Sequence, residues 1–186
     1  MSDYIITYSK IHFYPLQPVM EDIKIVDIAH SLSLMTRANG HCKHFYSVAH
    51  HTVNCYKEAK VRAYSERVQL GCLLHDSSES YISDLTRPVK RQLKDYFAIE
   101  EKLENQIYEK YGLGDLKEEE IWQIKDVDDA LLYFEFIELM DIPLCEIPPK
   151  KYMSHDFSQR DFISVENEFI DTFNKLMKSK IRKYVE

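Results

Sequence analysis

Apolar residues recur at intervals of three and four along nearly all of the chain after residue 24, and this helical spacing constrains the fold most. Only four glycines occur in 186 residues, and the alternation typical of strands is rare. Helices are predicted at 25–36, 47–60, 65–76, 78–83, 86–94, 96–111, 117–140 and 159–179. The sequence therefore predicts an all-α helical bundle.

Two segments depart from this pattern. Residues 4–14 are rich in β-branched and aromatic side chains and precede Pro15, which predicts a short N-terminal β-hairpin. Residues 141–157 contain three prolines and predict a loop that packs on the domain. Asp115, ahead of a Glu-rich turn, suits the start of the long helix because acidic side chains favour the positive end of the helix dipole.

Length and composition predict one domain that spans residues 1–186, since 45% hydrophobic content can form a core without disulfides. The four cysteines form no C-x-x-C pair, and we interpret them as free thiols with mostly packing roles. Neither a membrane span nor a signal peptide is recognisable, so we expect a soluble, cytoplasmic protein. The net charge of −7 disfavours nucleic acid as a partner.

The segment Leu70-Gly-Cys-Leu-Leu-His75-Asp76 ends an apolar helix with two adjacent groups that can bind a metal. Adjacent helical side chains point about 100° apart, so the two converge on one ion only near the helix end. A His-Asp pair alone is weak evidence, and a second pair, His155-Asp156, lies in a polar segment after prolines. We expect a metal role for the first pair only.

A stripe on the long predicted helix places two carboxylates on an apolar seam. Its members are Ile121, Ile124, Asp128, Leu131 and Glu135. An unpaired buried carboxylate costs several kcal/mol, so the stripe predicts a metal, a cation or strong donors beside it. A metal site and a buried ion pair with an arginine both remain open.

His51 shares a helical face with Val48 and Cys55, which predicts that it faces the core. His50 lies about 100° away on the same helix and is predicted to be exposed or at the rim. A single core-facing histidine is usually hydrogen-bonded packing. His51 gains weight because it completes a set of two imidazoles and two carboxylates.

This set predicts one divalent transition metal. Its members are His51, His75, Asp76 and Asp128. Such donors suit Mn²⁺, Fe²⁺, Co²⁺, Ni²⁺ or Zn²⁺ better than Ca²⁺, and they leave room for water and substrate. Glu79, one turn beyond the pair, and Asp84, in the next turn, are predicted to position or deprotonate the attacking water. The alternative for both is a capping or exposed carboxylate.

Several stretches match one known family in its order. They are Asp27-Ile-Ala-His-Ser-Leu-Ser, Arg37-Ala-Asn-Gly-His41, Phe45-Tyr-Ser-Val-Ala-His-His51, Leu73-Leu-His-Asp-Ser-Ser-Glu-Ser-Tyr-Ile-Ser-Asp84, Arg87-Pro-Val-Lys90 and Ile124-Lys-Asp-Val-Asp128. In combination they resemble the HD-domain phosphohydrolases, in particular the subgroup of bacterial 5′-deoxynucleotidases and phage deoxynucleoside triphosphate triphosphohydrolases. The resemblance covers most of the chain from about residue 3 to residue 140.

The resemblance implies a role for each matched residue. It implies that the metal ligands are His51, His75, Asp76 and Asp128, and that Glu79 and Asp84 act on the water. Arg37 is similar to the residue that grips phosphate, for which a forked guanidinium is well suited; a surface arginine is the alternative. His41 and Lys90 are expected to line the pocket. Two residues depart from the family: His50 replaces a common Glu or Gln, and Ala38 a bulky residue.

We therefore expect a metal-dependent phosphohydrolase that acts on a small (deoxy)nucleotide, with a 5′-nucleoside monophosphate favoured. The alternatives are a triphosphohydrolase that releases tripolyphosphate and a non-catalytic nucleotide-binding module. No Walker phosphate loop, nucleophile elbow or H-E-x-x-H pair occurs, which argues against kinases and serine hydrolases. The resemblance also implies a homodimer, with a contact face, or else core, around Phe162, Phe169 and Phe173.

Overall fold

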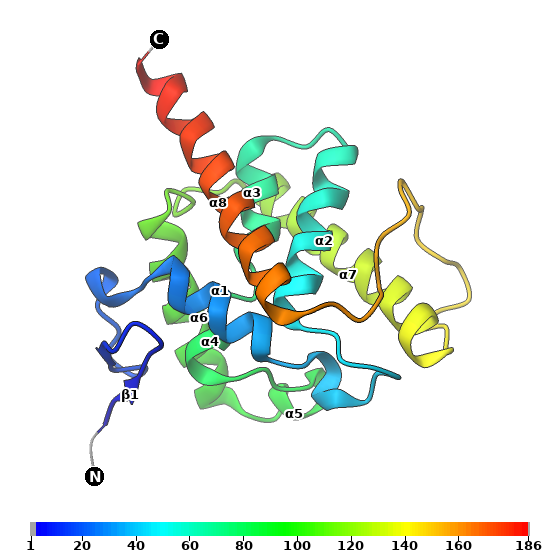
Figure 1. Ribbon diagram of the computed structural model, residues 1–186, viewed down its shortest axis with the longest axis horizontal. Helices are drawn as coiled ribbons and strands as arrows, with labels where there is room; N and C mark the ends of the chain where they lie inside the picture. The colour runs from blue at the N-terminus through cyan, green and yellow to red at the C-terminus, as the bar shows by residue number, and fades with distance from the viewer. Residues whose placement is uncertain (1–2, 186) are drawn as a thin grey trace.

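The computed structural model describes residues 3–185, with side chains described as far as residue 180 (Figure 1). Its helices are α1 (Ile25–Leu34), α2 (Val48–Val61), α3 (Glu66–Leu74), α4 (Glu79–Ile82), α5 (Arg87–Lys90), α6 (Lys94–Lys110), α7 (Glu118–Met140) and α8 (Phe162–Val185). Short 3-10 turns are η1 (Met20–Asp22) and η2 (Arg37–Gly40). The helical prediction is confirmed. The largest differences are that α5 ends at Lys90 and that α8 continues to Val185.

The predicted hairpin is present but very short. Strands β1 (Ile5–Ile6) and β2 (His12–Phe13) pair antiparallel, with Ile5 opposite Phe13. Phe13 is fully buried and stacks on Tyr81 of α4, with ring centroids 4.0 Å apart. Burial of this one aromatic ring attaches the hairpin to the helical domain.

Helix α2 lies at the centre of the bundle and packs against α1, α3, α7 and α8 (Figure 1). Helices α3 and α7 approach closely because α3 carries a glycine at their contact. A Cβ atom on Gly71 would lie 2.2 Å from Cδ1 of Ile124, so a larger residue at position 71 would displace the Ile124 side chain. This close packing sets the end of α3 beside the middle of α7.

The loop predicted at 141–157 is confirmed, and it extends to residue 161 because α8 begins at Phe162 rather than at 159; the segment packs against α2. His155 Nε2 lies 2.8 Å from Glu58 Oε2, and both side chains are completely buried. Asn54 donates a hydrogen bond of 2.8 Å to the carbonyl of Asp156, and a ring nitrogen of His44 bonds to the carbonyl of Phe157. These contacts fix the loop to the domain at several points.

The structure corrects two expectations about helix ends and faces. Asp115 does not begin α7: its carboxylate pairs with Arg67 at 2.8 Å, and the backbone N–H of Lys117 donates to Glu120 instead. The expected dimer face on α8 is largely core, because Phe169 and Phe173 are buried. Homodimer formation itself stays a prediction.

No helix within the described residues has the length and apolar character needed to cross a membrane.

Candidate metal centre

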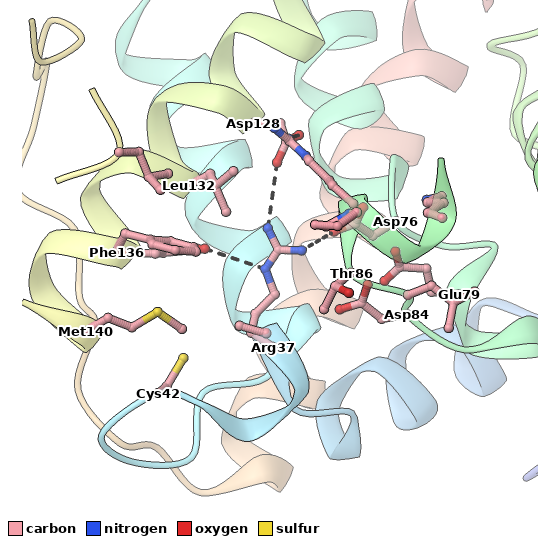
Figure 2. Close-up of a pocket in the computed structure, with 17 residues that line it drawn as sticks. Arg37, Cys42, Asp76, Glu79, Asp84, Thr86, Asp128, Leu132, Phe136 and Met140 are labelled. Atoms are coloured by element: carbon pink, nitrogen blue, oxygen red, sulfur yellow. Dashed lines mark hydrogen bonds and ion pairs between the residues drawn. The ribbon is translucent and has the colours of Figure 1, made fainter. Parts of the chain in front are cut away.

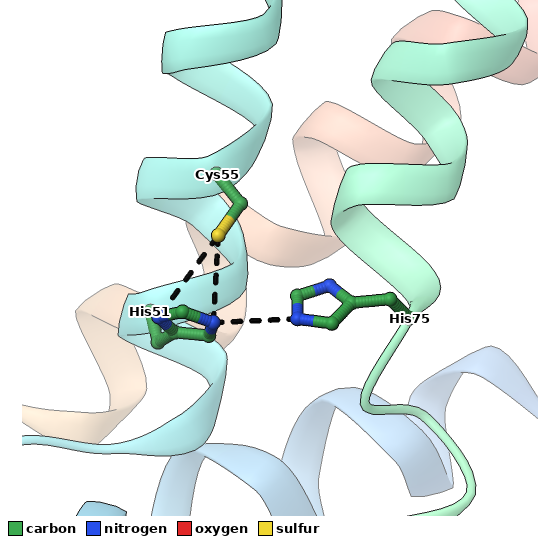
Figure 3. Close-up of side chains that lie close together, drawn as sticks. All are labelled: His51, Cys55 and His75. Carbon is green, nitrogen blue, oxygen red and sulfur yellow. Dashed lines mark hydrogen bonds between the residues drawn. The ribbon is translucent and has the colours of Figure 1, made fainter. Parts of the chain in front are cut away.

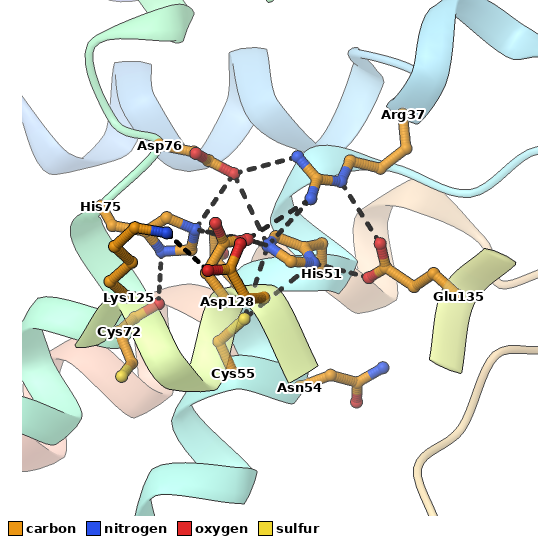
Figure 4. A network of polar contacts seen from close by, with 12 residues as sticks. Arg37, His51, Asn54, Cys55, Cys72, His75, Asp76, Lys125, Asp128 and Glu135 are labelled. Atoms are coloured by element: carbon orange, nitrogen blue, oxygen red, sulfur yellow. Dashed lines mark hydrogen bonds and ion pairs between the residues drawn. The ribbon is translucent and has the colours of Figure 1, made fainter. Parts of the chain in front are cut away.

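The four predicted ligands come from three helices and meet at one point (Figure 4). His51 completes the first turn of α2, and His75 with Asp76 follows the last turn of α3. Asp128 lies midway along α7. His51 Nε2 lies 3.1 Å from Asp128 Oδ1, 3.3 Å from His75 Nε2 and 3.7 Å from Asp76 Oδ2. His75 Nε2 lies 3.4 Å from Asp76 Oδ2 and 3.6 Å from Asp128 Oδ1.

These separations suit ligands of a single ion. Nitrogen and oxygen ligands lie about 2.0–2.2 Å from a divalent transition metal, so neighbouring ligands lie about 2.8–3.6 Å apart at angles of 90° to 110°. The distances in the structure run from 3.1 to 3.7 Å, so all but the His51–Asp76 distance fall within this range. The geometry of the donor set therefore fits such a metal.

Both imidazoles are oriented by hydrogen bonds from their other ring nitrogen. His51 Nδ1 donates to Glu135 Oε1 at 2.5 Å, and His75 Nδ1 donates to the carbonyl of Cys72 at 3.0 Å. A proton on Nδ1 leaves the lone pair on Nε2, which faces the other donors. Metal-binding histidines in proteins are held in this way, by a carboxylate or a carbonyl behind the ring.

A thiol lies beside the two histidines (Figure 3). Cys55 follows His51 by one turn of α2, and its Sγ is 3.4 Å from His51 Nε2. One donor atom each from His51, Cys55 and His75 lies within 4.8 Å of the others, so these three could hold a metal ion. The cysteine set and the carboxylate set share both histidines, so they describe one centre.

Arg37 extends its guanidinium toward the same donors, so the arginine ion pair left open by the sequence is also formed. Nη1 lies 3.3 Å from Asp76 Oδ2, and Nη2 donates to His51 Nε2 at 3.1 Å. Burial alone would lower the pKa of Arg37, but Glu135, Asp76 and Asp128 outweigh it and raise the pKa well above its usual value. The surface-arginine alternative is wrong, since the Arg37 side chain is only 13% exposed.

The backbone at Arg37 explains this orientation. The Arg37 N–H donates to the Tyr46 carbonyl at 2.8 Å, which ties the turn to the start of α2. The next residues, Ala38 and Asn39, have φ values of 50° and 51°. Left-handed backbone costs about 1–2 kcal/mol per non-glycine residue. This turn carries His41 to the exposed surface, where it does not line the cavity described next.

A cavity of about 400 Å³ opens beside the donors (Figure 2). Its charged lining comprises Arg37, Asp76, Glu79, Asp84, Arg87, Lys90, Asp128 and Glu135. On the other side of Arg37 the wall includes Cys42, Leu132, Phe136 and Met140 and is largely apolar (Figure 2); Ala38 and Leu144 also line the cavity. Three of these residues, Leu132, Phe136 and Met140, lie on one face of α7 at spacings of four from Asp128. The cavity thus combines a charged end with an apolar end.

Glu79 and Asp84 lie at the charged end. Glu79 is 4% exposed, and its Oε2 has no hydrogen-bond partner within the described part of the chain. Burial, with Asp76 and Asp84 nearby, raises the pKa of Glu79 well above its usual range. Burial also raises the pKa of Asp84, although Arg37 opposes the shift. Glu79 is therefore not an exposed carboxylate, the alternative that the sequence left open for it.

His50 is not exposed, contrary to expectation. It is 2% exposed and packs against Tyr46, with ring centroids 4.6 Å apart. Burial lowers its pKa to about 4, so the ring is neutral. His50 does not line the cavity. Its ring lies on the face of α2 that packs against α8, near Asp156 and Glu168.

Two residues near the centre were not assigned functional roles from the sequence. Arg87 Nη2 lies 3.2 Å from Asp128 Oδ2 and 3.0 Å from Asp129 Oδ1. Glu135 was placed on the buried stripe, but its partner was unknown until α2 and α7 were seen to pack. Arg87 could have been assigned a role from the sequence, because it begins the stretch Arg87-Pro-Val-Lys90 that resembles the HD-domain family.

Comparisons with known proteins identify relatives but no activity. The chain is 44% identical over 110 residues to the uncharacterized protein YfdR of Escherichia coli, an alignment that covers 59% of each protein. It is 36% identical over 104 residues to the uncharacterized protein RCAP_rcc00048 of Rhodobacter capsulatus, covering 53% of each. The chain thus matches little more than half the length of these relatives, and no family model matches it.

Proposed function

We propose that this chain is an HD-type, divalent-metal-dependent phosphohydrolase of small nucleotides, with a 5′-nucleoside monophosphate as the favoured substrate. The observation that carries the proposal is the convergence of two imidazoles, each oriented through Nδ1, with two carboxylates at the wall of a cavity that is also lined by two arginines and a lysine. The proposed ligands are His51, His75, Asp76 and Asp128. The candidate ions are Mn²⁺, Fe²⁺, Co²⁺, Ni²⁺ and Zn²⁺.

A metal held by these ligands supplies a Lewis acid that lowers the pKa of bound water and offsets charge on a phosphoryl group. The chain supplies the groups that bind and orient the phosphate. Arg37, Arg87 and Lys90 present two guanidinium groups and one ammonium group to the same cavity. Planar guanidinium forks bind phosphate oxygens in pairs, which aligns the phosphorus for in-line attack.

Glu79 and Asp84 supply proton transfer. A raised pKa brings a carboxyl group closer to neutral pH, where general acid–base catalysis is most effective. The buried Glu79, whose Oε2 has no partner within the described residues, suits donation of a proton to the departing oxygen. Asp84, at the same end of the cavity, suits acceptance of a proton from the attacking water. Lys90, whose Nζ lies 2.5 Å from Glu100, adds positive charge nearby.

The apolar end of the cavity suits a nucleoside. Leu132, Phe136 and Met140 follow Asp128 on one face of α7 and offer a surface on which a base can pack. The volume of about 400 Å³ lies near the lower end of the range for small-molecule sites. A monophosphate fits this limited space better than a triphosphate chain.

The test is product analysis with a panel of deoxy- and ribonucleotides in the presence of Mn²⁺, Co²⁺ or Mg²⁺. Release of inorganic phosphate from monophosphates supports the proposal, whereas tripolyphosphate from triphosphates supports the alternative hydrolase. Nucleotide binding by calorimetry without any release over long incubation would instead indicate a binding module.

A further inference from the structure

The thiol of Cys55 belongs to the metal centre by position. Cys55 is fully buried and lies four residues after His51 on α2. Side chains at this spacing occupy one helix face, one turn apart, so they can bind the same ion. In Figures 3 and 4 the sulfur lies beside the His51 ring, close to both of its nitrogens.

The distance from the thiol to the histidine suits joint ligation. Zinc–sulfur bonds are about 2.3 Å and zinc–nitrogen bonds about 2.0–2.1 Å, so the two ligands lie about 3.3–3.6 Å apart at angles of 100° to 110°. Cys55 Sγ lies 3.4 Å from His51 Nε2. The donor atom of His75 is within 4.8 Å of both. The sulfur also lies 3.9 Å from His51 Nδ1, so it is off the direction of the Nε2 lone pair, and ligation requires a rotation of the Cys55 side chain toward an ion between the histidines.

A second buried cysteine provides the internal comparison. Cys72 is also fully buried and packs in the same apolar cluster as Cys55. Its carbonyl holds the His75 ring, but its sulfur is not among the grouped donor atoms of the described residues. Two thiols of equal burial thus differ in whether they face the donors.

We propose that Cys55 is a thiolate ligand, which makes the centre a mixed imidazole, carboxylate and thiolate site that prefers Zn²⁺, Co²⁺ or Fe²⁺ to Mg²⁺ or Mn²⁺. Soft sulfur ligands favour these ions, whereas sites of oxygen alone favour Mg²⁺ and Mn²⁺. On binding, the S–H bond breaks, a sulfur–metal bond forms and the proton leaves to solvent, without any change in oxidation state. The inference rests on the metal centre of the proposed function and is independent of turnover.

Cobalt spectroscopy tests this ligand directly. The full-length protein is freed of metal by a chelator and given one equivalent of Co²⁺ under anaerobic, reducing conditions. Wild type is expected to show the visible d–d bands of bound cobalt and a near-ultraviolet sulfur-to-cobalt charge-transfer band. Cys55→Ala and Cys55→Ser keep the d–d bands but lose the charge-transfer band. The matched control, Cys72→Ala, keeps both.

Two further measurements do not depend on the cobalt spectra of the variants. X-ray absorption of the zinc-loaded wild type should show a sulfur neighbour at about 2.3 Å. In competition titrations, the ratio of Zn²⁺ affinity to Mn²⁺ affinity should be at least about tenfold lower in Cys55→Ser than in wild type. Tenfold is the smaller loss of metal affinity typical of residues that only support a ligand, so a ligand itself should cost at least as much.

The outcomes separate this inference from the proposed function. Bound cobalt without a charge-transfer band in wild type, or an equal band in Cys55→Ala, overturns the thiolate and leaves the carboxylate–histidine centre intact. Failure of wild type to bind cobalt at all overturns the centre and the thiolate together. Loss of phosphate release with the charge-transfer band retained overturns only the hydrolase.

Discussion

The chain contains two His-Asp pairs with opposite roles in the structure. At His75-Asp76, both side chains point toward the histidine and aspartate of other helices, and Asp76 lines a cavity. At His155-Asp156, the ring bonds to Glu58, and the Asp156 carboxylate accepts the N–H of Ser158 in its own turn. The second pair fastens a loop to α2.

The difference shows that neighbours, rather than the dipeptide, decide the chemistry. His75 lies beside donor atoms of His51 and Asp128 that converge on one point, whereas His155 contacts a glutamate already bonded to Arg62 at 2.8 Å. A His-Asp pair at the end of an apolar helix lies in the interior of the bundle, beside other helices. A pair in a proline-rich loop reaches only the surface on which that loop packs.

Replacing the aspartate of each pair with asparagine should give the largest difference in activity between the two pairs. Asp76→Asn is expected to lower metal-dependent phosphate release by about a thousandfold, because the metal stabilises transition-state charge by several kcal/mol. Asp156→Asn, the matched control, should change the rate by less than about threefold. Equal losses in initial-rate assays of the two variants would show that the pairs do not differ.

The glutamates that accompany the two pairs sharpen the comparison. Glu79→Gln should lower kcat by about a hundredfold or more, since a positioned acid contributes about 10²–10⁴-fold. Glu58→Gln should leave kcat unchanged, because Glu58 faces His155 and Arg62 rather than the cavity. Metal content should be unaffected in both variants. A Glu79→Gln enzyme with full kcat would remove Glu79 from the mechanism.

Loss of the second histidine should affect stability instead. His155→Ala leaves Glu58 Oε2 buried without its partner, which costs about 1–3 kcal/mol. Urea unfolding of wild type and variant at the same metal concentration measures this difference. Unchanged stability, or an activity loss at temperatures where the variant is folded, would contradict a purely structural role.

Acidic pH should lower the free energy of unfolding through protonation of Glu58, the partner of His155 in the second pair. Burial would raise the pKa of Glu58, but hydrogen bonds from His155 and Arg62 outweigh it and lower the pKa below its ordinary value of 4.5. A lowered folded-state pKa gives stability that is complete above about pH 4.5 and is lost as the pH falls further. The urea midpoint of wild type should therefore fall more steeply below about pH 4.5 than that of Glu58→Gln.

The smallest effect is expected at His41. Its side chain is exposed and lies outside the cavity, so His41→Ala should change kcat/KM by less than about twofold. Lys90→Gln, which alters a cavity-lining cation, should raise KM more than His41→Ala does. Steady-state kinetics with a nucleoside monophosphate compares the two. A larger effect at His41 would mean that the turn after Arg37 closes over the substrate.

The sequence predicted the inward faces of single helices, and from them one ligand set on three helices. It missed contacts that arise only when a further layer packs on a helix. Periodicity placed His51 and Glu135 on buried faces because each helix has an inward side. It placed His50 outward, since a single helix gives no sign that another layer covers its second face. Cys55 resembled packing for the same reason: its relation to His75 exists only because α2 packs against α3.

The most direct test of the central claim is the metal content of three proteins after equilibrium dialysis against Co²⁺ or Zn²⁺. Wild type and Asp156→Asn are predicted to hold one ion per chain, and Asp76→Asn to bind at least about tenfold more weakly. Equal binding by Asp76→Asn, or loss of the ion in Asp156→Asn, would contradict the assignment of the metal centre to the first His-Asp pair.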